Sequence, residues 1–545
     1  MRRHATLTLL LAGGLSLLLA LGGCDSLTSY NENPNEATSA NPNNLLANAQ
    51  RYIAGEVFDD NNMMRRSNVW AQYTTQNFYP SESRYSPVSY PWSGFYNRLT
   101  DLKTAKQIAQ ERPSTVRNQG NFQAVATIMQ AWTFQILTDA YGDIPFEEAL
   151  QQRDNQSPVY TAQSEIYPAL VDSLNTALGQ IDTEAAGPSG DLVNGSNMEM
   201  WKKFANGLKM RIALRGYELD ADWGDLGGPA DILSNAVDPN TNGEPLTSNA
   251  DNVYFQFGTS ATHRNDYYEN REVSFRDDFD GSERFIDFMK TKYGSADPRL
   301  DAYFEQTSNS GRPCEDGSGE YAGFPFALEQ GDAQDTYSAN PSCVFSRPEA
   351  WFPSGPSGSG DSFAPMMYYD EVLLTKAWAA NEGIIGGDAQ ALIGQAIEAS
   401  VDFYGSETDA DISSSSSATQ DYIAQVQSDF TSDPQQVIGE QRYVSFYMHN
   451  IQGWSTWRRF DFEGVLGAPE GGVAGGFDQY APLRVPYPDS EANLNGDNYE
   501  TVASKCSGDW QGSEASDGGA QNEDEDCRVA WDVDGPPEDD PYSAD

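Results

Sequence analysis

The chain has 545 residues, with 81 acidic and 33 basic side chains, which gives a formal net charge of −48 at pH 7. This balance excludes a nucleic-acid partner, because phosphate recognition needs basic surfaces. The acidic side chains are spread along the whole chain, which favours a protein of a high-salt habitat over a calcium-binding acidic protein, since such a charge destabilises a compact state in ordinary salt.

The N-terminus has the parts of an export signal. A short basic start is followed by an apolar run from Leu7 to Leu21, which is too short for a typical membrane-spanning helix. The next residues, Gly22-Gly23-Cys24, complete a segment that resembles the lipobox of bacterial lipoproteins. Residues 1–23 are therefore predicted to be a signal peptide, and Cys24 the lipidated residue that anchors the mature chain to a membrane. The alternative is an ordinary secretory signal in which Cys24 falls here by chance.

Residues 24–42 are polar and rich in Asn and Pro, and we expect a tether between the lipid and a domain over 43–545. Helical periodicity dominates after the tether. Helices are predicted at residues 96–111, 121–140, 162–181, 198–217, 282–292, 366–383, 388–404, 419–430 and 434–450. Their recurrence in pairs indicates a mainly α fold of tetratricopeptide-like helical hairpins, although no strict repeat consensus is visible. The scaffold should cover about 43–220 and 366–465.

Loop-rich sequence separates the two helical parts. Residues 218–281 and 305–365 are rich in Gly, Ser, Asp, Pro and aromatic residues and are too long for plain connections. Long loops on a helical scaffold commonly carry binding sites, so the ligand region is predicted at about 221–365. Residues 495–545 form an acidic, Gly-rich extension.

Four cysteines remain after Cys24, and an even number in an exported chain indicates disulfides. Three pairings are possible, and we favour the local ones, Cys314 with Cys343 and Cys506 with Cys527. Each bridge would close a loop of roughly 20 to 30 residues and contribute about 3 kcal/mol. Metal binding is the lesser alternative, because no Cys-x-x-Cys motif is present.

Catalytic motifs of serine hydrolases, zinc proteases and phosphate-binding loops do not occur in the sequence, so we expect a protein that is not an enzyme. No cofactor is expected. Calcium is a weak possibility at residues 59–61 or 532–534, where acidic side chains cluster without the full EF-hand spacing.

Aromatic residues make up 12% of the chain, which is high and indicates surfaces where flat rings meet a ligand or a partner. The densest candidate segment covers residues 70–92, and a second candidate lies in the loops from 267 to 352. The chosen ligand-contact residues are Trp70, Gln72, Tyr73, Asn77, Tyr79, Arg84, Trp92, Arg271, Arg347 and Trp351. The structural alternative is that about half of such aromatics lie in the core or at a partner interface.

Two further pairs are interpreted as structural. Trp201 and Phe204 lie on the apolar face of a predicted helix and should be core residues. Arg458 and Arg459 follow two tryptophans and are expected in a buried ion pair with an acid such as Glu371 or Asp461 rather than at a ligand.

Eight sequence blocks, in order along the mature chain, together resemble the SusD/RagB family of outer-membrane nutrient-binding lipoproteins. They are NENPN at 31–35, TDAYGDIPF at 138–146, SPVY at 157–160, WKKFANGLKMR at 201–211, DPRL at 297–300, MMYYDEV at 366–372, GWSTWRR at 453–459 and RVPYP at 484–488. The segment 375–379 departs from the acidic, Ala-rich helix that the family has after Glu371.

The resemblance implies four tetratricopeptide-like hairpins and a loop-rich ligand region. It also implies a partner, a SusC-like TonB-dependent transporter in the outer membrane, on which the lipid-anchored protein acts as an outward-facing lid. The cargo of the family is usually an oligosaccharide and sometimes a peptide. Oligosaccharide binding is therefore the favoured function, with peptide binding as the first alternative and a secreted glycosidase as the second.

Overall fold

The computed structural model describes residues 40–58, 63–86, 91–151, 153–238, 243–276, 278–307, 321–339, 345–349, 362–449, 451–460, 466–467, 470–471 and 482–503. The signal peptide, Cys24, most of the predicted tether, all four remaining cysteines and both calcium candidates lie outside these ranges. Helical structure begins at Pro42, one residue before the expected start of the folded domain.

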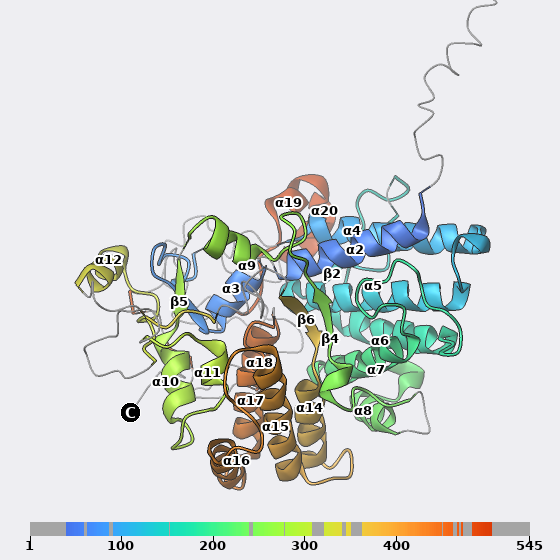
Figure 1. Cartoon of the computed structure of the whole chain (residues 1–545). Coiled ribbons are helices and arrows are strands. Elements are labelled where there is room, and N and C mark those ends of the chain that lie inside the picture. The colour runs from blue at the N-terminus through green and yellow to red at the C-terminus, as the bar shows by residue number, and fades with distance from the viewer. Residues whose placement is uncertain are drawn as a thin grey trace, which may run out of the picture. The chain divides into compact units, whose positions relative to one another are not determined.

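The first helical series comprises α2 (Pro42–Val57), α4 (Ser93–Glu111), α5 (Gln119–Tyr141), α6 (Gln163–Gln180), α7 (Met198–Arg215) and α8 (Pro229–Val237). Successive members pack against one another, so that hairpins stack in chain order from α2 to α8 (Figure 1). The short helix α3 (Met63–Trp70) interrupts the series and packs on α18 instead.

The second helical series comprises α14 (Tyr369–Asn381), α15 (Ala389–Glu407), α16 (Ser417–Phe430), α17 (Pro434–Ser445) and α18 (Gln452–Phe460). Here too each helix packs on its successor, and α14 also packs on α7 of the first series. The mainly α fold of helical hairpins is confirmed. The predicted helix at 366–383 is wrong at its start, where residues Phe363–Met367 form strand β6 before α14 begins.

Local sequence sets several helix ends. The Asn118 side chain accepts a hydrogen bond from the Asn121 N–H at 2.9 Å and caps α5. The same helix ends at Gly142, whose φ of +77° is readily adopted only by glycine. Asp433 caps α17, and Pro434 occupies its first helical position, where a missing N–H costs nothing.

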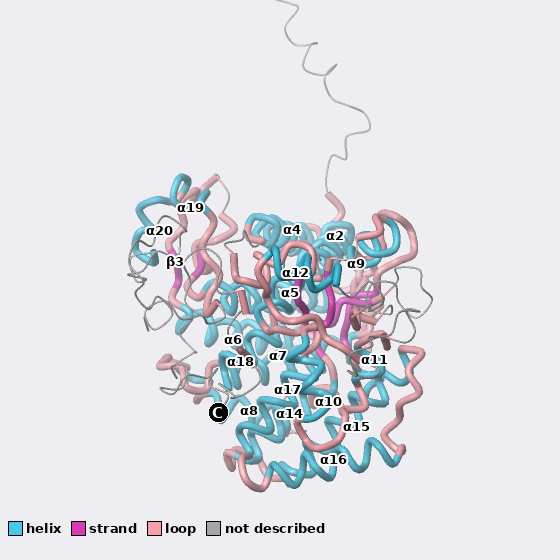
Figure 2. Tube along the Cα trace, turned by 90° about the vertical axis from the view of Figure 1, so that its left-hand side faces the viewer, coloured by secondary structure: helices cyan, strands magenta, loops and turns pink. Residues whose placement is uncertain are grey.

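The strands are short and make up a small share of the structure beside the helices (Figure 2). They form three antiparallel two-stranded ribbons: β1 (Thr74–Gln76) with β5 (Phe279–Gly281), β2 (Ile144–Pro145) with β3 (Tyr160–Thr161), and β4 (Val253–Gln256) with β6. The remaining helices are α9 (Asp266–Tyr268), α10 (Glu283–Thr291), α11 (Leu300–Tyr303), α12 (Gln330–Ala339), α19 (Asp489–Leu494), α20 (Gly496–Ala503), the π-helical turn η5 (Glu269–Val273), and the 3-10 turns η2 (Pro113–Thr115), η3 (Gly224–Leu226) and η4 (Asn249–Asp251).

One apolar core runs through both helical series, and its largest fully buried side chains include Trp132, Trp201, Trp378 and Trp454. The prediction that Trp201 and Phe204 are core residues is confirmed, since neither is exposed. No helix within the described ranges combines the length and apolar character needed to cross a bilayer.

The two buried arginines are held in different ways, and Arg459 forms an ion pair with an acid other than those named. Arg458 donates to the carbonyl oxygens of Leu483 and Asp139, at 2.7 and 3.0 Å, and its guanidinium lies 3.5 Å from the Trp454 ring centre. Arg459 pairs with Glu218 at 3.1 Å. The predicted pairing with Glu371 is therefore wrong, because Glu371 accepts from Arg211 of α7; Asp461 lies outside the described residues.

Candidate ligand-binding surface

The loop that follows α3 is closed at its base by two side chains, Gln72 and Tyr85. Both residues have left-handed backbone, with φ of +55° and +57°. Gln72 Nε2 donates to the Tyr85 hydroxyl and to the Gly467 carbonyl, each at 2.7 Å, while Gln72 Oε1 accepts from Arg284 Nη1 at 2.9 Å and from the Gly467 N–H at 3.0 Å. These four bonds use the whole capacity of the amide, so Gln72 holds the loop from within.

The ribbon of β1 and β5 positions the tip of this loop. Thr75 stands opposite Asp280, and beyond the strands the Asn77 N–H donates to the Asp278 carbonyl at 3.0 Å. Asn77 Nδ2 also donates to Asp280 Oδ2 at 2.8 Å. Because an antiparallel ribbon brings the end of one strand beside the start of the other, residues 78–79 and 275–276 come to the same end of it.

This end of the ribbon carries three of the exposed aromatic side chains of the described chain. Phe78, Tyr79 and Phe275 are 59%, 43% and 86% exposed. The Phe78 and Tyr79 rings meet edge to face at 5.0 Å, and the Arg276 guanidinium lies 5.9 Å from the centre of the Tyr79 ring. We call these four residues the aromatic surface.

Polar groups border the aromatic surface and fix its backbone. Arg276 pairs with Asp278, with Nε and Oδ2 at 2.8 Å, and Gln330 Nε2 of α12 donates to the Phe78 carbonyl at 3.1 Å. In the same loop Glu82 accepts from Arg65 and Arg66 at 2.8 and 3.1 Å. Flat rings beside charged and amide side chains can cover the C–H face of a sugar while binding its hydroxyl rim.

Phe275 is held in a strained conformation by the turn that ends η5. Its φ is +53°, a region that costs a non-glycine residue about 1–3 kcal/mol. Hydrogen bonds on both sides impose it, from the Ser274 N–H to the Glu269 carbonyl and from the Arg276 N–H to the Asn270 carbonyl, both 2.9 Å. Because the ring is exposed, burial does not offset this strain, which points to a role outside folding.

Several residues predicted as exposed contacts are instead buried, and that part of the prediction is wrong. Trp70 packs on Trp454 of α18 with ring centres 4.8 Å apart. Tyr73 stacks on Tyr443 of α17 at 4.5 Å, and burial raises the pKa of its hydroxyl well above the ordinary range. Ligand contact at these buried side chains, and at Gln72 and Asn77, stays a prediction that the observed burial does not favour.

Trp92 belongs to another cluster, where it is buried against Tyr141 with ring centres 4.8 Å apart. Its Nε1 donates to Glu491 Oε1 at 3.1 Å. In the second candidate segment, Arg271 and Arg347 are brought together by Glu305, which pairs with both. These three residues form a half-buried cluster, while Trp351 lies outside the described residues. Of the predicted contacts, Tyr79 lies on the aromatic surface and Arg84 in the same loop.

Phe78 and Phe275 lie in the two candidate segments but were not among the chosen contact residues, and Arg276 was not chosen either. No local pattern marked Phe275 as exposed, because Val273 stands two positions before it and Phe279 four positions after it, as in a strand or a helix. Among the described residues, no three His, Cys, Asp or Glu side chains gather closely enough to hold a metal ion.

The hairpin scaffold and its loop-borne aromatic surface define a class of helical protein that presents exposed rings on long loops. The sequence also matches the SusD-like family described as "Starch-binding associating with outer membrane" over residues 34–488. The chain therefore belongs to the SusD-like family, an outer-membrane-associated family of binding proteins. No curated protein matches the sequence.

Solved structures share the fold at low sequence identity. A chitin-binding protein is 21% identical with a TM-score of 0.69, covering 91% of this chain and 100% of its own. A SusD homologue from Bacteroides fragilis is 21% identical with a TM-score of 0.67, over 91% and 99% of the two chains. A chitin-binding SusD homologue from Flavobacterium johnsoniae is 20% identical with a TM-score of 0.65, over 90% and 98%.

Proposed function

We propose that this protein is a surface lipoprotein that binds nutrient oligosaccharides at the aromatic surface and passes them to a SusC-like TonB-dependent transporter. The observation that carries the proposal is the exposed set of Phe78, Tyr79 and Phe275 beside Arg276, on a SusD-like scaffold. The protein acts without catalysis, anchored in the outer membrane through lipid on Cys24 and facing outward.

Oligosaccharides are favoured over peptides by the character of this surface. Its rings are exposed and flat-faced, and the charged groups beside them, Arg276 with Asp278 and Glu82 with Arg65, already pair with each other. A neutral ligand with an apolar face and many hydroxyls suits such a surface better than a charged peptide. Two of the structural neighbours are described as chitin-binding, and the family description names starch, which supports glycans as the cargo.

Calorimetry on the purified mature chain tests the binding step, with malto-oligosaccharides, chito-oligosaccharides and a mixed peptide digest as titrants at low and high salt. Phe275→Ala and Tyr79→Ala should each weaken glycan binding by about tenfold, since a stacked aromatic contributes on the order of 1.4 kcal/mol. Leu494→Ala is the matched control, because Leu494 is an exposed apolar side chain on α19, outside this surface. Binding of peptides alone, or release of reducing sugars from a polysaccharide, would contradict the proposal.

The anchor and the transporter are tested in cells. Cys24→Ala should move the protein from the membrane fraction to the soluble fraction when the transporter is absent. With the transporter present, wild-type protein should co-purify with it in mild detergent. Retention of the Cys24→Ala protein in membranes that lack the transporter argues against the lipid anchor. Failure to co-purify argues against the transporter as partner and leaves the lipid anchor unaffected.

A further inference from the structure

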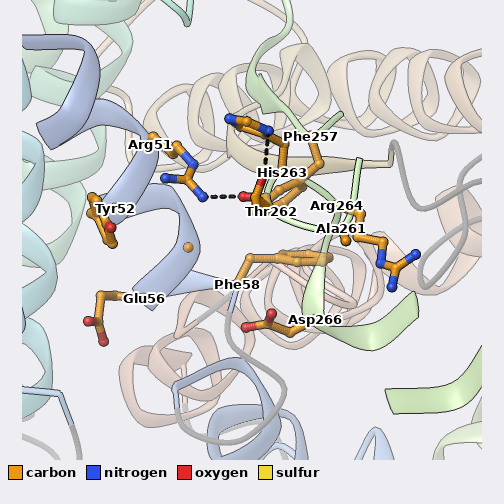
Figure 3. A pocket seen from close by; sticks show the side chains of 11 residues that line it. Arg51, Tyr52, Glu56, Phe58, Phe257, Ala261, Thr262, His263, Arg264 and Asp266 are labelled. Atoms are coloured by element: carbon orange, nitrogen blue, oxygen red, sulfur yellow. Dashed lines mark hydrogen bonds between the residues drawn. The ribbon is translucent and has the colours of Figure 1, made fainter. Parts of the chain in front are cut away.

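A cavity lies between α2 and the loop that precedes α9. It has a volume of about 270 Å³ and is lined on one side by Arg51, Tyr52, Gly55, Glu56 and Phe58, and on the other by Phe257, Ala261, Thr262, His263, Arg264 and Asp266 (Figure 3). None of these residues belongs to the aromatic surface.

The cavity has an apolar floor and an aromatic wall. Phe58 and Phe257 are buried with ring centres 5.8 Å apart and form the floor. Tyr52 is 46% exposed, so one part of its ring is open to a ligand. The guanidinium groups of Arg51 and Arg98 lie 5.2 and 4.9 Å from the centre of this ring. A six-membered ring with an apolar face fits between such a floor and wall.

Arg51 supplies a cation for which the described residues provide no ion-pair partner. One of its N–H groups donates to the Thr262 carbonyl, which joins the two sides of the cavity. The other cations differ, since Arg264 pairs with Glu269 and Arg98 pairs with Asp101. A guanidinium has five N–H donors in a fork that matches a carboxylate, so Arg51 retains donors for an anionic group.

The acidic side chains of the cavity stand apart from this cation. Figure 3 shows Glu56 and Asp266 on one side of Phe58, with Arg51 and His263 on the other. Glu56 Oε1 lies 2.6 Å from where a Cβ on Gly94 would stand, so its carboxylate is directed at the first turn of α4. The positive end of that helix partly balances its charge. Carboxylates on this side can accept hydrogen bonds from hydroxyl groups.

The loop side adds hydroxyl groups next to Arg51. The hydroxyls of Ser260 and Thr262 lie 2.7 and 2.9 Å from His263 Nδ1 and hydrogen-bond with it. These contacts hold the imidazole at the rim of the cavity.

We infer that this cavity binds a hexuronic acid unit, with its carboxylate on Arg51, its apolar ring face on Tyr52 and Phe58, and its hydroxyls toward the side that carries Asp266. The inference rests on the proposed function, since it takes the cargo to be a glycan, and it deepens that function by naming acidic sugars as the class. A glycan bound here would be recognised by charge as well as by ring stacking.

Titration of glucuronic, galacturonic and mannuronic acids, each paired with its neutral parent sugar, tests the inference on the full mature chain. At least one acid should bind more tightly than its parent, and Arg51→Gln should weaken that acid about tenfold, the effect of losing one charge-assisted contact. Arg98→Gln is the matched control, because Arg98 touches the same Tyr52 ring without lining the cavity. Circular dichroism and Tm would establish that both variants are folded.

The outcomes separate this inference from the proposed function. Equal binding of every acid and its parent, or equal binding by wild type and Arg51→Gln, overturns the cavity assignment. So does Arg51-dependent binding of an amino acid such as L-glutamine without binding of any uronic acid. If neutral oligosaccharides fail to bind and Phe275→Ala has no effect, while an acid binds through Arg51, the aromatic surface fails and the cavity assignment stands.

Discussion

The junction between α7 and α14 and the aromatic surface both join segments far apart in the chain, but they use opposite means. At the junction Arg211 and Glu371 are almost wholly buried and form a two-pronged ion pair, with Nε to Oε1 at 2.6 Å and Nη2 to Oε2 at 2.7 Å. At the aromatic surface Phe275 is 86% exposed in a strained backbone conformation. The junction therefore contributes to stability through buried charges, whereas the aromatic surface exposes a ring to solvent.

The difference shows what separates a scaffold residue from a binding residue in this protein. The scaffold side chain of Tyr73 has its ring covered by Tyr443 and its hydroxyl engaged with the Tyr443 carbonyl. The rings at the end of the β1–β5 ribbon are uncovered, although the backbone beneath them is firmly fixed. Changes in the first region should lower stability, and changes in the second should lower ligand binding.

The largest effect on stability is expected at the buried junction. Glu371→Ala leaves Arg211 buried without its partner, next to Arg442, whose pKa burial lowers to about 9. Breaking a buried pair from one side costs about 3–5 kcal/mol, which urea unfolding would measure. Asp101→Ala, which breaks the surface pair with Arg98, should cost less than about 1 kcal/mol. An equally small cost for Glu371→Ala would remove the contrast between the two regions.

The next effect concerns pH and the buried carboxyl of Asp370. Burial raises its pKa from 3.8 to about 6, against hydrogen bonds from Ser445 and the Glu371 N–H, and the charge of Arg299. As pH rises, the unfolded state loses the Asp370 proton near pH 4, whereas the folded state keeps it until near pH 6. The free energy of unfolding should therefore fall between these two pH values, by on the order of 3 kcal/mol.

Asp370→Asn tests this pH dependence, because an amide can keep the hydrogen bonds to Ser445 and the Glu371 N–H. The variant should match the wild type near pH 4 and exceed its free energy of unfolding at pH 7. Urea unfolding at a series of pH values measures both. A wild-type-like slope between pH 4 and 6 in the variant would show that another group titrates there.

A smaller effect is expected at the base of the binding loop, where the two regions meet. Gln72→Ala removes four hydrogen bonds and should cost about 1–3 kcal/mol, since it leaves the buried Tyr85 hydroxyl without the amide that donates to it and removes one acceptor of Arg284. It should also weaken glycan binding, because the loop that carries Tyr79 loses the hydrogen bonds at its base. Gln330→Ala removes one exposed bond to the Phe78 carbonyl and should change stability by less than about 0.5 kcal/mol. Unchanged glycan binding by Gln72→Ala would show that Phe78 and Tyr79 keep their positions without the hydrogen bonds of Gln72.

Sequence periodicity predicted the scaffold well and the binding surface poorly, for one physical reason. The helices at 121–140 and 198–217 appear as α5 and α7 within two residues at each end, because their burial follows from neighbours three and four positions away. The burial of Tyr73 depends on Tyr443, 370 residues further along the chain, and no local pattern encodes that contact. α8, inside a segment predicted as loop, was missed although Ile232, Leu233 and Ala236 lie on one face.

The smallest effect on stability, and the sharpest separation of the two regions, is expected at Phe275. Phe275→Asn keeps the left-handed backbone, which asparagine tolerates better than phenylalanine, so the free energy of unfolding should stay the same or rise by up to about 1 kcal/mol. Glycan binding should nevertheless fall by about tenfold, because the exposed ring is gone. Leu494→Asn, at an exposed apolar residue away from the surface, should leave binding unchanged. If Phe275→Asn lowered stability and left binding intact, the strained ring would be a packing element after all, and the aromatic surface would belong with the scaffold.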